Sequence, residues 1–335
     1  MALLDSRQRP LKDLRISVTD RCNFRCTYCM PREHFGSDHV FLPRDELLSY
    51  EEIAVVVDAL MSCGLQKVRL TGGEPLLRRN ITDLVAMLRS VGPGLDLAMT
   101  TNGALLKTHA KALQKAGLNR VTVSLDAVDV DTFQSMADTQ KIHPDVIFEG
   151  VEEARRAGLT VKINAVVRKG VNEDQILPLA HACHRRDIPL RFIEYMDVGN
   201  TNAWKLDEVV TGAEIRRLIE AEFGSLKTET PHERGEVARR FRLKSGYEFG
   251  FIESVSNPFC GDCSRARLSA NGSIYTCLFS SKGNDLKGLL RFGASPEEVQ
   301  QAIRSIWLRR DDRYSMERTE RMGTEKKVEM SFIGG

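Results

Sequence analysis

Residues 14–31, "LRISVTDRCNFRCTYCMP", join a short apolar run to a loop that carries Cys22, Cys26 and Cys29. The β-branched and apolar residues at the start of this stretch predict a β-strand, and the cysteines follow where the strand ends. Three thiols spaced C-x3-C-x2-C within eight residues indicate a metal site. The stretch therefore predicts a strand whose carboxyl end presents sulfur ligands.

Two kinds of metal centre compete for these cysteines. A zinc ion would need a fourth ligand, and His34 or His39 lies near enough in the sequence to supply it. Zinc sites usually pair their ligands as C-x2-C knuckles joined by a longer spacer. In a [4Fe–4S] cluster, three cysteines bind three irons and leave the fourth iron open to a ligand that is not protein. We favour the three-cysteine cluster, with zinc as the alternative.

The order of a strand followed by a helix recurs along the first 200 residues. Apolar runs typical of strands follow at 67–71, 95–101, 120–126, 161–167 and 190–196, and helical patterns occupy 45–63, 80–91, 105–116, 145–157 and 173–186. This alternation predicts an α/β fold with a parallel sheet, and the apolar strands predict burial on both faces. An open doubly wound sheet and a closed or partial α/β barrel both fit. Either would gather the polar segments "TGGEP" (71–75), "TTNG" (100–103) and "EYMDVG" (194–199) at one edge.

The alternation stops near residue 200. A helix over 211–223, hairpins around 241–254 and 265–279, and a helix over 296–309 are expected there. We therefore divide the chain into a region of alternating strands and helices, 1–200, and a C-terminal α+β extension, 201–335.

Composition limits the classes of function. The chain has 335 residues with a net charge of +2, which argues against a general nucleic-acid binder. It shows no secretory signal and no apolar run long enough to cross a bilayer, so we expect a cytoplasmic protein without a membrane partner. Eight cysteines in a reducing compartment indicate metal or redox chemistry rather than disulfides. Cys63 and Cys183, which stand alone in helical patterns, are expected to be packing residues.

A second group of three cysteines lies in the C-terminal region. Cys260, Cys263 and Cys277 have the spacing C-x2-C-x13-C, which fits a second three-cysteine cluster or a zinc ribbon that lacks one ligand. Arg265 and Arg267 lie shortly after Cys263 in the sequence. On an isolated strand they would form a solvated face, whereas beside a metal site their guanidinium groups would bind an anion such as phosphate.

The motifs together resemble those of a known family. The first triplet, with Tyr28 before its last cysteine and "TGGEP" after the second strand, resembles the signature of radical S-adenosylmethionine enzymes. With "NPFCGDCSRARL" (257–268) and the terminal Gly-Gly, residues from about 9 to 335 resemble the GTP 3′,8-cyclase family, lyases of molybdenum cofactor biosynthesis. The resemblance implies a partial (β/α)6 TIM-type barrel with a C-terminal extension, two [4Fe–4S] clusters and S-adenosyl-L-methionine.

The resemblance also implies roles for individual residues. It gives the first cluster to Cys22, Cys26 and Cys29, and S-adenosylmethionine contacts to Tyr28, Gly73, Ser124 and Met196. It gives the second cluster to Cys260, Cys263 and Cys277, and GTP contacts to Arg15, Arg69, Thr100, Lys162, Arg265, Ala266 and Arg267, with Lys67 and Arg191 as additions. Taken alone, Met196 would be a core residue and each cation a surface charge. Cations within apolar strands nevertheless favour an anionic partner, because burying an unpaired charge is costly.

The implied reaction is a radical cyclisation in which no side chain is the catalyst. A 5′-deoxyadenosyl radical takes the ribose 3′ hydrogen of GTP, and C3′ then attacks guanine C8. The product is (8S)-3′,8-cyclo-7,8-dihydroguanosine 5′-triphosphate, which a cyclic pyranopterin monophosphate synthase would receive.

The resemblance implies further partners and a role for the C-terminus. An electron donor is required, and homodimers are common among similar proteins. The tail ending in Gly334 and Gly335 would enter the active site near Arg265 and Arg267, although a frayed terminus fits the residues equally well. The alternatives are a peptide-modifying radical enzyme and a zinc-binding scaffold without activity.

Overall fold

A twelve-stranded sheet forms the centre of the part of the chain that the computed structural model describes, residues 2–231, 235–321 and 326–335. The strands are β1 Asp13–Ser17, β2 Lys67–Thr71, β3 Asp96–Thr101, β4 Arg120–Ser124, β5 Thr160–Val167, β6 Leu190–Glu194, β7 Lys227–Thr228, β8 Arg239–Arg242, β9 Glu248–Ile252, β10 Arg265–Leu268, β11 Ser273–Tyr275 and β12 Asn284–Asp285. The six strands predicted for the first 200 residues are β1 to β6, each within two residues of its predicted ends.

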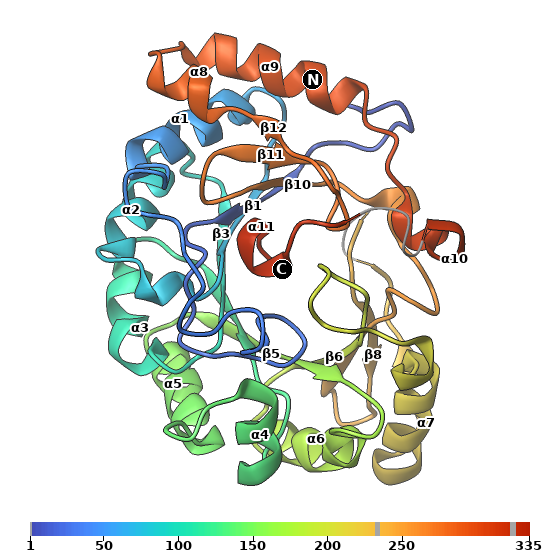
Figure 1. Ribbon diagram of the computed structural model, residues 1–335. Coiled ribbons are helices and arrows are strands. Elements are labelled where there is room, and N and C mark those ends of the chain that lie inside the picture. Colours follow the sequence, from blue (N-terminus) through green and yellow to red (C-terminus); the bar gives the residue numbers. More distant parts are fainter. Residues whose placement is uncertain (1, 232–234, 322–325) are drawn as a thin grey trace.

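The order of the strands makes the sheet an open barrel. It runs β12-β11-β10-β1-β2-β3-β4-β5-β6-β9-β8-β7, with β12 and β7 at its two ends. The strands from β10 to β9 in this order are parallel, and the outer strands pair antiparallel. In Figure 1 the sheet curves, and helices surround it on the outside. The predicted partial α/β barrel is confirmed.

The positions of the helices agree with the prediction better than their first and last residues do. They are α1 Tyr50–Met61, α2 Ile81–Val91, α3 Leu106–Lys115, α4 Val130–Ala137, α5 Pro144–Arg156, α6 Ile176–His184, α7 Gly212–Phe223, α8 Lys287–Arg291, α9 Pro296–Leu308, α10 Arg318–Arg321 and α11 Met330–Ile333. The helix predicted over 45–63 starts later because Ser49 caps it, accepting from the Glu52 amide at 3.1 Å while Glu52 accepts from the Ser49 amide. The sequence prediction missed α4, α8, α10 and α11.

The two faces of the barrel strands differ in chemistry. Leu14, Ile16 and Val68 point outward and are fully buried under the helices, where each contributes roughly 1.5–3 kcal/mol of transfer free energy. Arg15 and Arg69, which alternate with them, line the interior of the barrel. The outer face of the strands is therefore buried under the helices, whereas the inner face surrounds a polar cavity.

The C-terminal region extends the sheet at both edges. The two predicted hairpins are present: β9 pairs with β8 and lies beside β6, while β10 pairs with β11 and lies beside β1. Helix α9 packs against α1, and α11 lies in the mouth of the barrel against β1 (Figure 1). The division at residue 200 stays a prediction, while the strands that follow it belong to the same sheet as the barrel. Among the described residues, no helix has the length and apolar character needed to cross a membrane.

Candidate active site

A cavity of about 550 Å³ occupies the interior of the barrel, and both cysteine triplets line it. Of the residues predicted for cofactor and substrate, the cavity is lined by Arg15, Cys22, Cys26, Tyr28, Cys29, Lys67, Arg69, Gly73, Thr100, Ser124, Lys162, Arg191, Met196, Cys260, Cys263, Arg265, Arg267 and Cys277. Ala266 lies between the two arginines of β10, but its side chain points into the core and is fully buried. Residues from both ends of the chain thus share one chamber.

The first triplet lies on a tight loop after β1. The amide of Cys29 donates to the Cys26 carbonyl at 2.9 Å, which closes a turn between the two ligands. The Phe24 amide donates to the sulfur of Cys22 at 3.4 Å, and the Asn102 side-chain amide approaches the same sulfur at 3.8 Å. Burial, and then the neighbouring thiols of Cys22 and Cys29, raise the pKa of Cys26. The sulfurs are therefore close enough to influence one another's ionisation.

The Gly-Gly-Glu segment after β2 packs directly against this loop. The Gly73 amide donates to the Thr19 carbonyl at 2.8 Å, and the Glu74 amide donates to the Arg21 carbonyl at 2.8 Å. A Cβ on Gly73 would lie 2.2 Å from the Arg21 carbonyl oxygen, so no side chain fits there. The backbone that approaches Gly73 belongs to the cysteine loop.

Buried carboxylates stand behind the first triplet. Asp126 accepts a hydrogen bond from the Tyr28 hydroxyl at 2.7 Å and another from the Val166 amide at 2.8 Å, and burial raises its pKa to about 6. Glu74 accepts from Thr101 and from the Asn102 amide, both at 2.8 Å, and burial raises its pKa to about 7. These contacts fix Tyr28 and the strand ends around the mouth of the cavity.

Cys260 and Cys263 of the second triplet precede β10, and Cys277 follows β11; the surroundings of Cys263 are cationic. Burial alone would raise the pKa of Cys263, but the guanidinium groups of Arg265 and Arg310 outweigh it and lower the pKa to about 6. The Phe279 amide donates to the sulfur of Cys277 at 3.5 Å, while burial and Asp312 raise the pKa of Cys277 to about 12. The two triplets therefore differ in the charge around them.

The donor sets fit iron–sulfur clusters. Each triplet offers three free thiols that are partly exposed to the shared cavity. Among the residues that the structure describes, no group of three or more His, Cys, Asp or Glu side chains is arranged to hold a metal ion. A [4Fe–4S] cluster does not need such an arrangement, because each cysteine binds a different iron and the sulfurs stand farther apart than around one ion.

Buried cations line the chamber between the triplets. The Arg69 guanidinium donates to the hydroxyls of Thr100 and Thr122, both at 3.1 Å. Burial lowers the pKa of Arg15 to about 10, that of Arg69 to about 10 and that of Lys162 to about 8. Burial, followed by the nearby charges of Arg15 and Arg265, lowers the pKa of Arg267 far below its usual value. The chamber thus holds positive charge that an anionic ligand would stabilise.

The C-terminal glycines enter this chamber. Arg267 donates to the carbonyl of Gly334, and Gly335 lines the cavity. Gly334 has a φ of 78°, and a Cβ there would lie 2.2 Å from the methyl group of Thr71. The tail is therefore packed beside Arg267, where the resemblance had predicted it.

Some residues that line the chamber were not predicted from the sequence. Asp126, Arg120, Thr122 and Asn164 all face the cavity from β4, β5 or the loop after β4. A signal for three of them was available, because polar residues recur at every second position of these apolar strands. Arg310 is not part of the cavity lining but contacts the Cys263 sulfur, and no such alternation marks it, because it follows α9.

Comparison with known proteins shows to which superfamily the chain belongs. The family model described as "Radical SAM superfamily" matches residues 16–183, and the one described as "Molybdenum Cofactor Synthesis C" matches residues 188–316. The structure is similar to Streptococcus suis SuiB bound to S-adenosylmethionine, with a TM-score of 0.61 and 18% identity over 89% of this chain and 68% of that chain. It is also similar to native anSMEcpe with bound AdoMet, with a TM-score of 0.58 and 15% identity over 85% and 81%. The fold and the matched model place this chain in the radical SAM superfamily.

Whole-chain relatives identify the family within that class. The chain is 48% identical over 338 residues to GTP 3′,8-cyclase of Staphylococcus carnosus, covering 99% of both chains. It is 47% identical to GTP 3′,8-cyclase of Staphylococcus haemolyticus and 46% identical to that of Staphylococcus aureus, in each case over 99% of this chain and 98% of the relative. The chain belongs to the GTP 3′,8-cyclase family, as the sequence motifs predicted.

Proposed function

We propose that the chain is a radical SAM GTP 3′,8-cyclase that converts GTP to (8S)-3′,8-cyclo-7,8-dihydroguanosine 5′-triphosphate. The observation that carries this proposal is one cavity that is lined by both cysteine triplets and by several buried cations. Full-length relatives named for this reaction support it.

The first triplet and its surroundings would hold the radical source. Cys22, Cys26 and Cys29 would bind a [4Fe–4S] cluster whose open iron takes S-adenosylmethionine. When bound, this pair supplies the radical chemistry of the reaction. Tyr28, held by Asp126, and Gly73, Ser124 and Met196 at other strand ends would position the cofactor. Their common place around the mouth of the cavity supports these roles.

The buried cations would hold the triphosphate. A triphosphate carries about four negative charges near neutral pH, so several cations must converge on it. Arg15, Arg69, Lys162 and Arg267 come from four strands, and burial is the main cause that lowers their pKa values, although Lys162 also pairs with Glu248 at 3.6 Å. Thr100, Arg265 and the backbone of Ala266 complete the proposed GTP contacts. The triphosphate would restore the protonated forms of these side chains.

The second triplet would hold a second [4Fe–4S] cluster and receive the guanine. Cys260 and Cys263 precede the amino end of β10, whereas the first triplet follows the carboxyl end of the parallel strand β1, so the ribose would lie between the two centres. We also propose an external electron donor, transfer of the product to a cyclic pyranopterin monophosphate synthase, a cytoplasmic location and a homodimer.

One assay tests this function. Anaerobic protein with both clusters is incubated with S-adenosylmethionine and a strong reductant, with and without GTP, and 5′-deoxyadenosine is measured. We expect GTP to stimulate its formation. If GTP has no effect and iron analysis shows intact clusters, the proposed substrate is wrong although the superfamily stands. Stoichiometric zinc without sulfide would instead favour the zinc-binding scaffold.

A further inference from the structure

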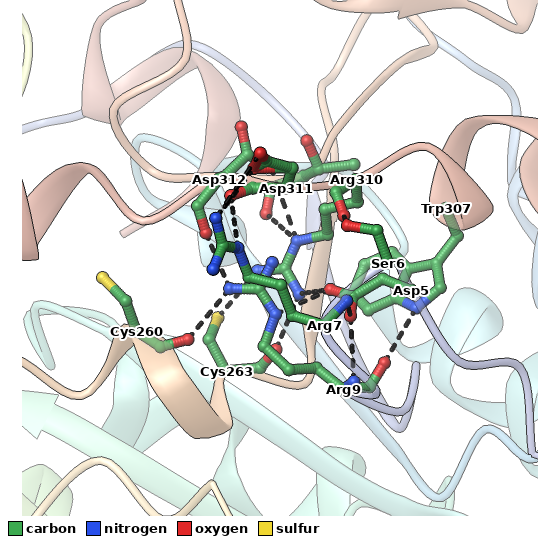
Figure 2. Close-up of polar contacts among 11 residues, drawn as sticks. Asp5, Ser6, Arg7, Arg9, Cys260, Cys263, Trp307, Arg310, Asp311 and Asp312 are labelled. Atoms are coloured by element: carbon green, nitrogen blue, oxygen red, sulfur yellow. Dashed lines mark hydrogen bonds and ion pairs between the residues drawn. The ribbon is translucent and has the colours of Figure 1, made fainter.

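A buried Arg–Asp–Arg group supports the second triplet from behind (Figure 2). Oδ2 of Asp5 accepts from Nε of Arg9 at 2.7 Å and from Nη1 of Arg310 at 3.1 Å. The three residues are 3%, 0% and 4% exposed, respectively. Because the carboxylate lies between the two guanidinium groups, it offsets part of the cost of burying them and fixes their orientation.

Both arginines contact the loop that carries the cysteines. Nη1 of Arg9 donates to the Cys260 carbonyl at 2.9 Å, and Nη1 of Arg310 donates to the Cys263 carbonyl at 2.7 Å. Nε of Arg310 donates to the Thr276 carbonyl, one residue before Cys277, at 3.1 Å. These bonds join the N-terminal segment and the end of α9 to all three parts of the second triplet.

Arg310 makes one contact that Arg9 does not. Its Nη2 donates to the sulfur of Cys263 at 3.2 Å, as Figure 2 shows. The indole of Trp307 lies 4.4 Å from the Arg310 guanidinium and covers it. At the first triplet, the donors to Cys22 are the Phe24 amide and the Asn102 side chain, which are both neutral. Among the described residues, a buried, charged donor to a ligand sulfur therefore distinguishes the second triplet.

We propose that Arg310 raises the reduction potential of the second cluster through its charged hydrogen bond to the Cys263 sulfur. This inference rests on the proposed function, because it requires a cluster at the second triplet. One-electron reduction adds a negative charge to the cluster and its thiolates, and no bond or proton need change. A cation that donates to a thiolate stabilises the more negative state, and hydrogen bonds to cluster sulfurs are a known determinant of potential. Arg310 is thus a positioning residue that also adjusts the cluster.

The test compares three variants of the full chain with both clusters reconstituted. Arg310→Gln removes the charge, Arg310→Lys keeps the charge but loses the planar fork, and Arg309→Gln removes the same charge at the neighbouring exposed position. Iron and sulfide are counted first. An EPR-monitored redox titration then gives the midpoint potential of each cluster, with the first cluster recognised by its response to S-adenosylmethionine.

We expect the second cluster of Arg310→Gln to be harder to reduce. At the midpoint potential of the unmodified second cluster, its ratio of reduced to oxidised cluster should fall about tenfold, equivalent to about 59 mV for one electron. Arg310→Lys should show a smaller fall, about threefold, and Arg309→Gln none. The first cluster should keep its potential in all three variants.

The other possible results either support or overturn the proposal about Arg310. An unchanged second potential in Arg310→Gln, with both clusters intact, would overturn the proposal. If Arg310→Gln loses its second cluster, the lowered potential of Arg310→Lys still supports the proposal, whereas loss of that cluster from both variants would overturn it and assign Arg310 to cluster retention. If the unmodified protein holds only about four irons, the two-cluster function fails before this inference is reached.

Discussion

The two cysteine triplets reach the same cavity by different routes. The first lies within eight residues on one loop, held by backbone bonds to the adjacent Gly-Gly-Glu segment. The second combines a short turn with Cys277, and its support comes from Asp5 and Arg310 at opposite ends of the chain. A local loop thus carries the proposed radical source, while the proposed substrate side depends on long-range contacts.

Their electrostatic surroundings differ in the same way. Burial, and then Glu74, raise the pKa of Cys22 to about 11, whereas Arg265 and Arg310 bring the pKa of Cys263 to about 6 despite burial. In the proposed function, the anionic substrate would lie on the cationic side, and the sulfonium of S-adenosylmethionine would lie on the side with the carboxylates. The comparison therefore predicts that the triplets can be separated by mutation.

The largest effect is expected when a cysteine of one triplet is replaced, so that the protein loses one cluster and keeps the other. Cys26→Ala should abolish formation of 5′-deoxyadenosine while the protein keeps about four irons and still binds GTP. Cys263→Ala should also keep about four irons, but it should lose GTP stimulation and retain binding of S-adenosylmethionine. Iron analysis and binding by calorimetry check both variants. Identical losses in the two variants would contradict a division of labour between the triplets.

The second prediction concerns the cations beside the second triplet. Arg265→Ala should weaken GTP binding about 10- to 100-fold, because a charge-assisted hydrogen bond contributes about 1.5–3 kcal/mol. Its iron content should stay unchanged. Arg304→Ala, at an exposed position on α9, is the matched control and should bind GTP normally. Loss of iron from Arg265→Ala would assign this arginine to cluster assembly instead of substrate binding.

The same contrast explains what the sequence could predict. Strands β1 to β6 carry strong local signals, because each is a short apolar run between amphipathic helices, and the cysteine spacing is likewise local. The pairing of β9 with β6 and of β10 with β1 depends on contacts between distant residues, for which one sequence offers no register. Asp5 and Arg310 are 305 residues apart, and no sequence motif predicts that they are in contact. The polar inner face could have been read from Arg120 and Thr122.

The third prediction is a smaller effect of pH on the substrate side. Lys162 has a pKa near 8 because burial, and then Arg191, disfavour its charged form. As the pH rises from 7 to 9 the free side chain loses its proton, so the affinity for GTP should fall, by about three- to tenfold. Lys162→Arg stays charged throughout this range and should remove most of the dependence. Calorimetric titration at several pH values provides the measurement.

Binding of S-adenosylmethionine at the first triplet is the control for that experiment. Its own dependence between pH 7 and 9 reflects Glu74 and the cofactor's amino group, and it should be the same in Lys162→Arg as in the unmodified protein, because Lys162 lies on β5 among the cations of the chamber. If Lys162→Arg changed the pH dependence of cofactor binding as much as that of GTP binding, the assignment to Lys162 would be contradicted.

The central claim is that both centres serve one chamber, so that substrate and cofactor meet there. Transfer of hydrogen between them tests this claim most directly. GTP deuterated at the ribose 3′ carbon is incubated anaerobically with the two-cluster protein, S-adenosylmethionine and a reductant, and 5′-deoxyadenosine is analysed by mass spectrometry. The account predicts one deuterium in 5′-deoxyadenosine, with cyclised nucleotide formed in parallel. Unlabelled 5′-deoxyadenosine, formed at the same rate with or without GTP, would contradict it.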